Sequence, residues 1–505
     1  MIDRNRQDEP LVSANGKSEP PVSVGARVEL TATWVDEEGR GVGRVRGTEV
    51  RAANVLPGER CQVQIEHVSS HQPRAWGRVT RRLSRVSPHR VTPSCPSFGS
   101  CGGCAWQHLD YDAQVACKVE RINEALSKAG IQVPESRIMK PLRAPRVEGY
   151  RNVAKYVVAR ARGRDRDRKV LLGAYIPRTH DFVDMEYCRV VEPIIERIRA
   201  AACQALAHVP VYRETDSGAE KNGVLRYVAV RCGSNGQAVV AIVTTSEARR
   251  PDLASRVAQA ARTLGDHPEV GGVVWLKNDE PGGVILAGEE TCIVGKDTVV
   301  EQIAGVELDV QIKDFFQVNR TQAAQLYAVV TRLAGKYSSR EASASGRITE
   351  RVIDLYCGAG GFAFALARAS ATRHVLGIER NQNAVRAAQV SATRAALGGR
   401  VSFRAADASR LAAISAETYG KEGPDLVIVN PPRKGLDADT RASLHVVDPL
   451  RLIYVSCKPE TLARDLAEFV APRGLYHIDE IVPIDLMPGT GHVETVVALS
   501  QPDEP

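Results

Sequence analysis

The chain has 505 residues, of which 43% are hydrophobic and 25% are charged. At roughly 150 residues per domain this length suggests about three domains. No apolar run is long enough to cross a membrane, and residues 1–20 lack the apolar core of a secretion signal. We therefore expect a cytoplasmic protein with no membrane partner, and a monomer is the simplest assembly. The net charge of +7 is small for this length and favours nucleic-acid binding only weakly.

The N-terminal part of the chain divides into a polar leader and a segment of short strands. Residues 1–21 are expected to be disordered. Residues 22–90 alternate apolar and polar side chains in short runs separated by turns, which predicts a small β-barrel. This segment holds twelve Arg against seven Asp or Glu, with Trp34 and Trp76 available to stack on bases. The alternative is a structural barrel whose arginines are simply solvated.

The rest of the chain predicts two further domains. Residues 91–310 mix a helical stretch at 113–130 with strand-like runs, which indicates a mixed α+β central domain. A low-complexity stretch at 337–347 predicts a flexible link or loop. Within residues 311–505, strands then alternate with helices from 351 onwards, which predicts an α/β domain with a parallel, doubly wound sheet.

A glycine-rich loop follows the first strand of that sheet, in the segment 352–361. Glycines there let the backbone approach a ligand at the carboxyl edge of the sheet. Glu379 ends the next strand, where a carboxylate accepts the ribose hydroxyls of a nucleoside, and Asp407 ends the third, suited to an adenine amino group. This order resembles the class I (Rossmann-like) methyltransferase fold, which binds S-adenosylmethionine. An ordinary dinucleotide fold is the alternative, but no G-x-G-x-x-G is present.

Two further motifs end the fourth and fifth strands: Asn430-Pro431-Pro432-Arg433 and Ser456-Cys457-Lys458-Pro459. A single cysteine is more often inert packing, but a place on the ligand edge makes Cys457 a candidate nucleophile. Arg433 and Lys458 would lower its pKa if they prove close in space.

A thiolate at this place suits methylation of carbon 5 of uracil, which is a poor nucleophile on its own. Attack of the thiolate on carbon 6 gives an enolate that takes the methyl group at carbon 5. The carbon 5 proton must then leave, which requires a general base. Glu494, with apolar flanks in Val493-Glu494-Thr495, is the first candidate for that base, and His492 is the second.

Together these motifs resemble the TRAM-domain RNA (uracil-5-)-methyltransferases, over nearly the whole chain. The resemblance implies a TRAM domain at 22–90, Cys457 as nucleophile and Glu494 as general base. Gln317, in Asp314-Phe315-Phe316-Gln317, matches a glutamine beside the cofactor and the base. The remaining implied cofactor residues are Tyr356, Gly361, Glu379, Asp407 and Asn430.

Asn430 departs from the family pattern, which usually has Asp before Pro-Pro-Arg. An amide donates as well as accepts, so hydrogen bonding to the base changes, and with it the choice of uracil over cytosine or the efficiency of catalysis. Asn-Pro-Pro also occurs in amino-methyltransferases, but those have an aromatic residue where this chain has Arg433, and that reaction leaves Cys457 without a role.

Cys95, Cys101 and Cys104 crowd into ten residues, which in a cytosolic protein indicates metal ligation. A closed metal site needs a fourth ligand from a remote part of the chain. The spacing alone is also compatible with a structural zinc site or with thiols that bind no metal. The resemblance points to Cys188 as that ligand and implies a 4Fe-4S cluster that fixes the central domain and the RNA path.

The sequence thus predicts a methyltransferase that makes 5-methyluridine in RNA, with 23S ribosomal RNA as substrate because TRAM and cluster occur together. A flipped-out uracil is expected. Transfer RNA as substrate, cytosine-5 methylation, and a non-catalytic RNA-binding or ribosome-assembly protein are the alternatives. An iron-sulfur radical or redox enzyme would want a C-x3-C-x2-C loop, which differs from the spacing here.

Overall fold

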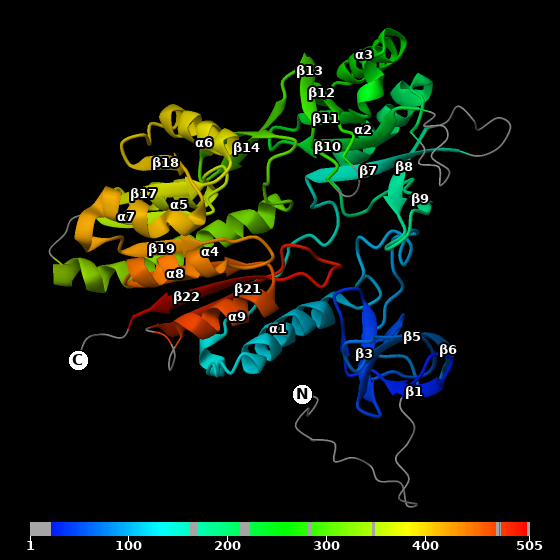
Figure 1. Cartoon of the computed structure of the whole chain (residues 1–505), viewed down its shortest axis with the longest axis horizontal. Coiled ribbons are helices and arrows are strands. Elements are labelled where there is room, and N and C mark those ends of the chain that lie inside the picture. Colours follow the sequence, from blue (N-terminus) through cyan, green and yellow to red (C-terminus); the bar gives the residue numbers. More distant parts are fainter. Residues whose placement is uncertain are drawn as a thin grey trace, which may run out of the picture. The chain divides into compact units, whose positions relative to one another are not determined.

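The computed structural model describes residues 22–161, 170–212, 223–280, 284–345, 349–470, 474 and 476–501 (Figure 1). The predicted leader, 1–21, lies outside them. The chain forms two compact units. The first contains residues up to 94 together with 103–117 and 489–491, and the second contains 95–102, 118–488 and the residues from 492 onwards. Among the described residues no helix is long and apolar enough to cross a membrane.

A six-stranded sheet forms most of the first unit, in the order β1-β5-β6-β4-β3-β2. Alternation in β1 buries Val28 and Leu30 on one face, where they join a small apolar core. The predicted small β domain is therefore present. Both tryptophans have partners inside the unit, since Arg51 lies over Trp34 and His67 packs against Trp76. The strands are β1 (Arg27–Thr31), β2 (Trp34–Val35), β3 (Arg40–Val45), β4 (Thr48–Ala53), β5 (Arg60–Val68) and β6 (Arg74–Arg82).

The second unit contains two seven-stranded sheets and a two-stranded one, and the boundary predicted at 310 falls within a strand of the small sheet, β15 (Val306–Gln311). The first sheet has the order β13-β12-β11-β10-β7-β8-β9, and helices α2 (Pro193–Ala205) and α3 (Pro251–Gly265) bury their apolar sides in its core. Its strands are β7 (Val153–Arg160), β8 (Val170–Tyr175), β9 (Phe182–Asp184), β10 (Leu225–Cys232), β11 (Ala238–Thr244), β12 (Val270–Lys277) and β13 (Glu289–Gly295).

The second sheet is the doubly wound sheet that the sequence predicts, in the order β18-β17-β16-β19-β20-β22-β21. Its first five strands are parallel, and β22 is antiparallel to both neighbours. The strands are β16 (Glu350–Leu355), β17 (Arg373–Glu379), β18 (Val401–Ala405), β19 (Leu426–Val429), β20 (Arg451–Ser456), β21 (His477–Ile484) and β22 (Glu494–Ser500). The helices of this region are α4 (Arg320–Ser345), α5 (Gly361–Ala369), α6 (Gln382–Arg394), α7 (Leu411–Tyr419), α8 (Ala438–Val447) and α9 (Pro459–Phe469).

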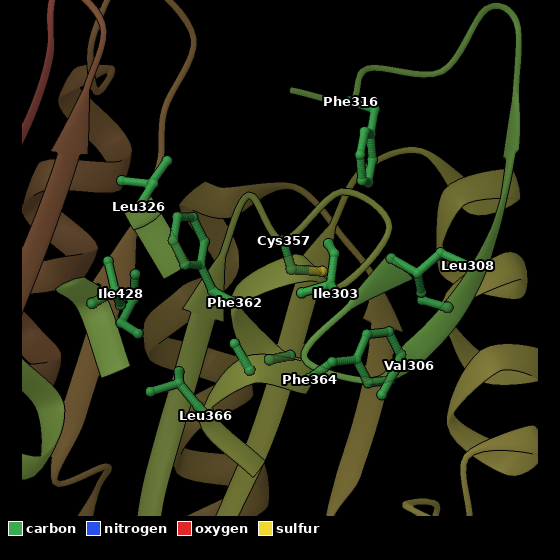
Figure 2. Packing of buried hydrophobic residues seen from close by; sticks show 14 of the residues in the cluster. Ile303, Val306, Leu308, Phe316, Leu326, Cys357, Phe362, Phe364, Leu366 and Ile428 are labelled. Carbon is green, nitrogen blue, oxygen red and sulfur yellow. The ribbon is translucent and has the colours of Figure 1, made fainter. Parts of the chain in front are cut away.

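Two further elements pack against this sheet. Helix α1 (Tyr111–Lys128) places Ile122 and Leu126 in an apolar core shared with the sheet. The hairpin of β14 (Thr298–Ile303) and β15 (Val306–Gln311) covers the other side, where Figure 2 shows its apolar side chains near Phe364. The glycine-rich loop is thereby backed by a continuous core.

The prediction of a loop at 337–347 is wrong for residues 337–345, because α4 continues to Ser345. The stretch from 337 to 345 contains neither glycine nor proline, and its Arg, Glu and Ala residues favour a helix. Low complexity was therefore a poor guide to backbone conformation here.

A buried ion cluster ties three strands together at the amino edge of the doubly wound sheet. The Glu350 carboxylate accepts from Arg373 Nε at 2.6 Å and from Arg451 Nη2 at 2.7 Å. Both arginine side chains are only 3% exposed. Since the three residues lie at the starts of β16, β17 and β20, the cluster fixes these strands at the edge away from their carboxyl ends.

We expect Glu350→Ala to destabilise the protein by about 3–5 kcal/mol, because it leaves two buried guanidinium groups without their carboxylate. Glu417→Ala removes the exposed partner of Arg404 and should cost at most about 1 kcal/mol. Chemical denaturation of both variants checks this. Equal losses would show that the cluster contributes no more than a surface pair.

Candidate active site

The carboxyl edge of the doubly wound sheet collects most of the predicted site residues. Parallel strands all end at the same edge, so the loops that follow them are neighbours. Five strands contribute in this way, and the predicted residues at or just after their ends are Tyr356, Glu379, Asp407, Asn430 and Cys457.

The register of β20 and β22 brings the predicted nucleophile and base together. In this antiparallel ladder Ser456 is the partner of Thr495. The next residues along the two segments are Cys457 and Glu494, so both lie at this end of the ladder. A substrate ring at this edge can therefore meet a thiol and a carboxyl group at once.

Glu494 is buried, with 5% of its surface exposed. Burial raises the pKa of its carboxyl group to about 8, since desolvation penalises the charged form. Burial raises the pKa of the Tyr327 phenol, on α4, and two other carboxylates raise it further. The charge of Glu494 makes the last contribution, so Tyr327 lies near Glu494. A carboxyl group with a pKa near 8 is a much stronger base than an exposed glutamate.

His492 is held by Arg433. The Arg433 Nη2 and His492 Nδ1 atoms are 3.3 Å apart. Because a guanidinium group only donates, Nδ1 must accept, and it cannot take up another proton while this bond stands. Of the two candidates for the base, the arrangement therefore favours Glu494.

The glycine-rich loop has an unusual backbone. Tyr356 has a φ of 64°, a left-handed conformation that costs a residue with a Cβ about 1–3 kcal/mol and is concentrated at functional sites. Gly358 has a φ of 54°, and a Cβ added there would meet nothing within 4 Å. The loop thus presents an open backbone surface at Gly358, as close approach of a ligand requires.

Gly361, predicted to bind the cofactor, lies against helix α4. A Cβ at Gly361 would come within 2.7 Å of the Tyr327 hydroxyl group, and the ring of Tyr327 packs edge-on against Phe362 at 5.1 Å. The structure therefore explains this glycine by close packing of α5 on α4.

Asp354 is a residue that the sequence reasoning missed. It is fully buried, one residue before the end of β16, and its Oδ2 accepts from the Ala363 amide of α5 at 3.1 Å. Gly360, the N-cap of α5, has no side chain with which to cap the helix, so Asp354 supplies the cap. Burial raises the pKa of Asp354 to about 7, and Oδ1 has no hydrogen-bond partner among the described residues. The sequence signal that identifies Asp354 is an acidic residue shortly before a glycine-rich loop.

Two carboxylates follow the neighbouring strands. Glu379 Oε2 accepts from the Gly358 amide at 3.2 Å, which aims the carboxylate at the glycine loop. Asp407 caps a short helical turn, Ala408–Arg410, through Oδ1, and its bonds to Ser409 lower its pKa. Among the described residues Oδ2 has no such bond. Both groups can accept hydrogen bonds from a nucleoside, so these donors and acceptors fit S-adenosylmethionine.

Helix α9 connects the Asn-Pro-Pro-Arg loop to Cys457, the predicted nucleophile. Asn430 is half-buried, and its backbone N–H donates to the Leu355 carbonyl at 3.3 Å. The helix begins two residues after Cys457, and its side chains hold the residues after Pro432. Thr461 donates to the Arg433 carbonyl at 3.2 Å, and buried Asp465 accepts from the Leu436 amide at 2.8 Å. The loops of Asn430 and Cys457 therefore share one support.

Gln317 lies outside the sheet, between β15 and α4, and is 8% exposed. Its carbonyl accepts from Asn152 Nδ2 at 3.1 Å. Phe315, two residues earlier, is 76% exposed, a second residue without an assigned role in the sequence reasoning. An exposed aromatic side chain is suited to stacking on a nucleobase.

The four predicted metal ligands are distributed over both units. Cys95, Cys101 and Cys188 lie in the second unit and Cys104 in the first. Burial raises the pKa of the Cys188 thiol, and the nearby Cys101 thiol raises it further. Within the described part of the chain, no three His, Cys, Asp or Glu side chains group as a metal site. The closeness of Cys101 and Cys188 fits a shared site, and the four-cysteine set stays a prediction.

The raised pKa of Glu494 predicts a pH-dependent stability. The unfolded chain ionises this group near pH 4.5 and the folded protein only near pH 8, so stability falls between these values. The free energy of unfolding of Glu494→Gln, relative to the wild type, should therefore rise by a few kcal/mol between these pH values. Above pH 8 the difference should stay constant. Thermal denaturation from pH 4 to 9 measures the difference, with exposed Glu417→Gln as the control. A constant difference between Glu494→Gln and wild type would contradict the burial of the charge.

Several known proteins are similar to this chain over most of its length. Residues 306–502 match the tRNA (Uracil-5-)-methyltransferase family model. An uncharacterized RNA methyltransferase of Thermosynechococcus vestitus is 34% identical over 94% of this chain and 98% of its own. Another, from Geobacter sulfurreducens, is 31% identical over 95% of this chain and 91% of its own.

A solved structure shares the fold. The tRNA (uracil-54, C5)-methyltransferase of Pyrococcus abyssi, in complex with S-adenosyl-L-homocysteine, superposes with a TM-score of 0.68. It is 24% identical and covers 94% of this chain and 100% of its own. From the two long relatives the conclusion is that the chain belongs to the RNA methyltransferases, and its residues 306–502 match the tRNA (Uracil-5-)-methyltransferase model.

Proposed function

We propose that the protein methylates carbon 5 of one uridine in RNA through a covalent adduct with Cys457. The observation that carries this proposal is the β20–β22 ladder, which ends at Ser456 and Thr495, so that Cys457 and buried Glu494 lie at the same end of it. A pure RNA-binding protein has no need of a thiol and a high-pKa carboxyl group facing one substrate position.

The chemistry follows from these two groups. The Cys457 thiolate bonds to carbon 6, and the carbon 5–carbon 6 π electrons move into an enolate. Carbon 5 then takes the methyl group from the sulfonium, whose carbon–sulfur bond breaks to leave S-adenosylhomocysteine. The Glu494 carboxylate removes the carbon 5 proton, and the electrons of that bond re-form the double bond and expel the thiolate.

The cofactor fits the glycine loop and the carboxylates that follow β17 and β18. Glu379 would accept the ribose hydroxyls and Asp407 the adenine amino group, and the open backbone at Gly358 would permit close approach. Tyr356 and Gly361 would shape the loop, and Gln317 and Asn430 would serve the methyl donor and the base. When bound, S-adenosylmethionine supplies the electrophilic methyl group.

The proposed substrate is 23S ribosomal RNA, with transfer RNA as the alternative. The six-stranded N-terminal domain and the cysteine cluster, together, support ribosomal RNA through the resemblance to TRAM-domain members. The target uracil must leave its stack to expose carbon 6, and Phe315 offers an exposed aromatic surface near Gln317. Cys95, Cys101, Cys104 and Cys188 would hold a 4Fe-4S cluster, whose role is to fix the fold.

Labelled S-adenosylmethionine with unmodified ribosomal or transfer RNA tests the reaction. Nucleoside mass analysis should show 5-methyluridine, and Cys457→Ala should abolish it, because the adduct cannot form. Cys203→Ala, at another half-buried cysteine, should retain activity. Product from Cys457→Ala would contradict the mechanism, and 5-methylcytidine would assign the specificity to the Asn430 amide.

The decay of the covalent adduct should depend on the protonation of Glu494. Its rate should rise with pH through about 8 and level off above, because only the carboxylate can accept the carbon 5 proton. Glu494→Gln should accumulate methylated adduct that survives denaturing electrophoresis. Single-turnover chase experiments measure the decay. A pH-independent rate, or free product from Glu494→Gln, would exclude Glu494 as the base.

Iron and sulfide analysis of anaerobically purified protein tests the cluster separately. Cys188→Ser should lose bound iron, because one thiolate ligand is missing. A visible absorption spectrum measures this independently of activity. Zinc in place of iron and sulfide would establish the alternative site.

A further inference from the structure

The segment that leads from β21 to Glu494 is held by side chains from three other parts of the second unit. Residues 485–488 have no regular secondary structure, yet each carbonyl accepts a hydrogen bond from a different side chain. The donors are Gln322 Nε2 to Asp485 at 2.9 Å, Asn319 Nδ2 to Leu486 at 3.0 Å, Lys118 Nζ to Met487 at 3.1 Å and Tyr150 Oη to Pro488 at 3.0 Å.

Lys118 also fixes the start of this segment through a charge pair. Its Nζ lies 2.6 Å from Asp485 Oδ1, and both side chains are only 2% exposed. The same carboxylate oxygen accepts from the Met487 amide at 3.1 Å. A buried pair of this kind contributes little to stability, and its best-attested use is to specify one conformation.

This bonding restricts the segment more than a surface loop is usually restricted. Loop carbonyls normally bond to water and tolerate several conformations, whereas these four are satisfied only in one. The segment begins directly after Ile484, which is the partner of Glu494 in the β21–β22 ladder. Asn319 lies two residues after Gln317, so the same contacts connect the cofactor-side glutamine to the approach of the base.

We propose that Lys118, Tyr150, Asn319 and Gln322 form a carbonyl clamp, a set of positioning residues that fixes the Glu494 carboxyl group for proton removal. The proposal rests on the proposed function. None of the four residues needs to touch the reacting atoms, because the clamp acts through the backbone of 485–488. Loosening it should slow adduct decay and leave cofactor binding unchanged.

Tyr150→Phe is the variant of choice, because it deletes one hydroxyl donor and leaves no buried charge unpaired, as Lys118→Met would. Tyr476→Phe is its matched control. Tyr476 is 4% exposed against 7% for Tyr150, and its hydroxyl group also donates to a proline carbonyl, that of Pro449, at 2.6 Å. Pro449 precedes the start of β20, at the opposite edge of the sheet from Cys457.

We expect Tyr150→Phe to lower kcat about tenfold and to accumulate covalent RNA adduct, with the affinity for S-adenosylmethionine unchanged. Tyr476→Phe should lose a similar free energy of unfolding but should not accumulate the covalent RNA adduct. Unchanged kcat in a folded Tyr150→Phe protein, or equal adduct in both variants, would overturn the clamp.

Hydrogen exchange separates this inference from the proposed function. Without RNA, the amide hydrogens of 485–487 should exchange faster in Tyr150→Phe than in the wild type, and at the wild-type rate in Tyr476→Phe. Wild-type protein that methylates no RNA would contradict the proposed function, while faster exchange confined to Tyr150→Phe would still support the clamp. Equal exchange in all three proteins would overturn it.

Discussion

The antiparallel pairing of β20 with β22 is the constraint on which the site depends. In an otherwise parallel sheet only carboxyl ends reach the ligand edge, so each strand offers just the residue that follows it. The reversed strand β22 brings an amino end to the same edge, and its first residue, Glu494, lies at the same end of the β20–β22 ladder as Cys457. A slip of one residue would turn Glu494 to the opposite face of the sheet and separate the two groups.

The surrounding structure makes this pairing usable for chemistry. Burial raises the pKa of the Glu494 carboxyl group to about 8, which suits its proposed role as base, at the cost of stability above pH 4.5. Helix α9 binds the loop after Pro432 and begins two residues after Cys457, so the proposed nucleophile and that loop share one support. Cofactor and RNA binding are then properties of loops attached to a rigid sheet.

The fold class, and the residues at the carboxyl edge of the doubly wound sheet, could be predicted from the sequence. The reason is that a strand, a loop and a helix follow one another regularly after residue 351. The helix to Ser345 was missed because composition was read as flexibility. Asp354 was missed because its role, capping α5 in place of a glycine, depends on contact across the loop. The contacts of residues 485–488 join positions more than a hundred residues apart in sequence, which no local pattern reveals. Cys188 was assigned by resemblance alone and is still a prediction.

Trapping the adduct with RNA that contains 5-fluorouridine is the most direct test of the account. Fluorine at carbon 5 cannot leave as a proton does, so the reaction must stop after methyl transfer with the nucleotide still bonded to sulfur. Peptide mass mapping after nuclease digestion should find a methylated fluorouridine on the peptide that contains Cys457. A nucleotide on another cysteine, or none on protein that converts normal RNA to 5-methyluridine, would contradict the claim that Cys457 and Glu494 act on the same ring.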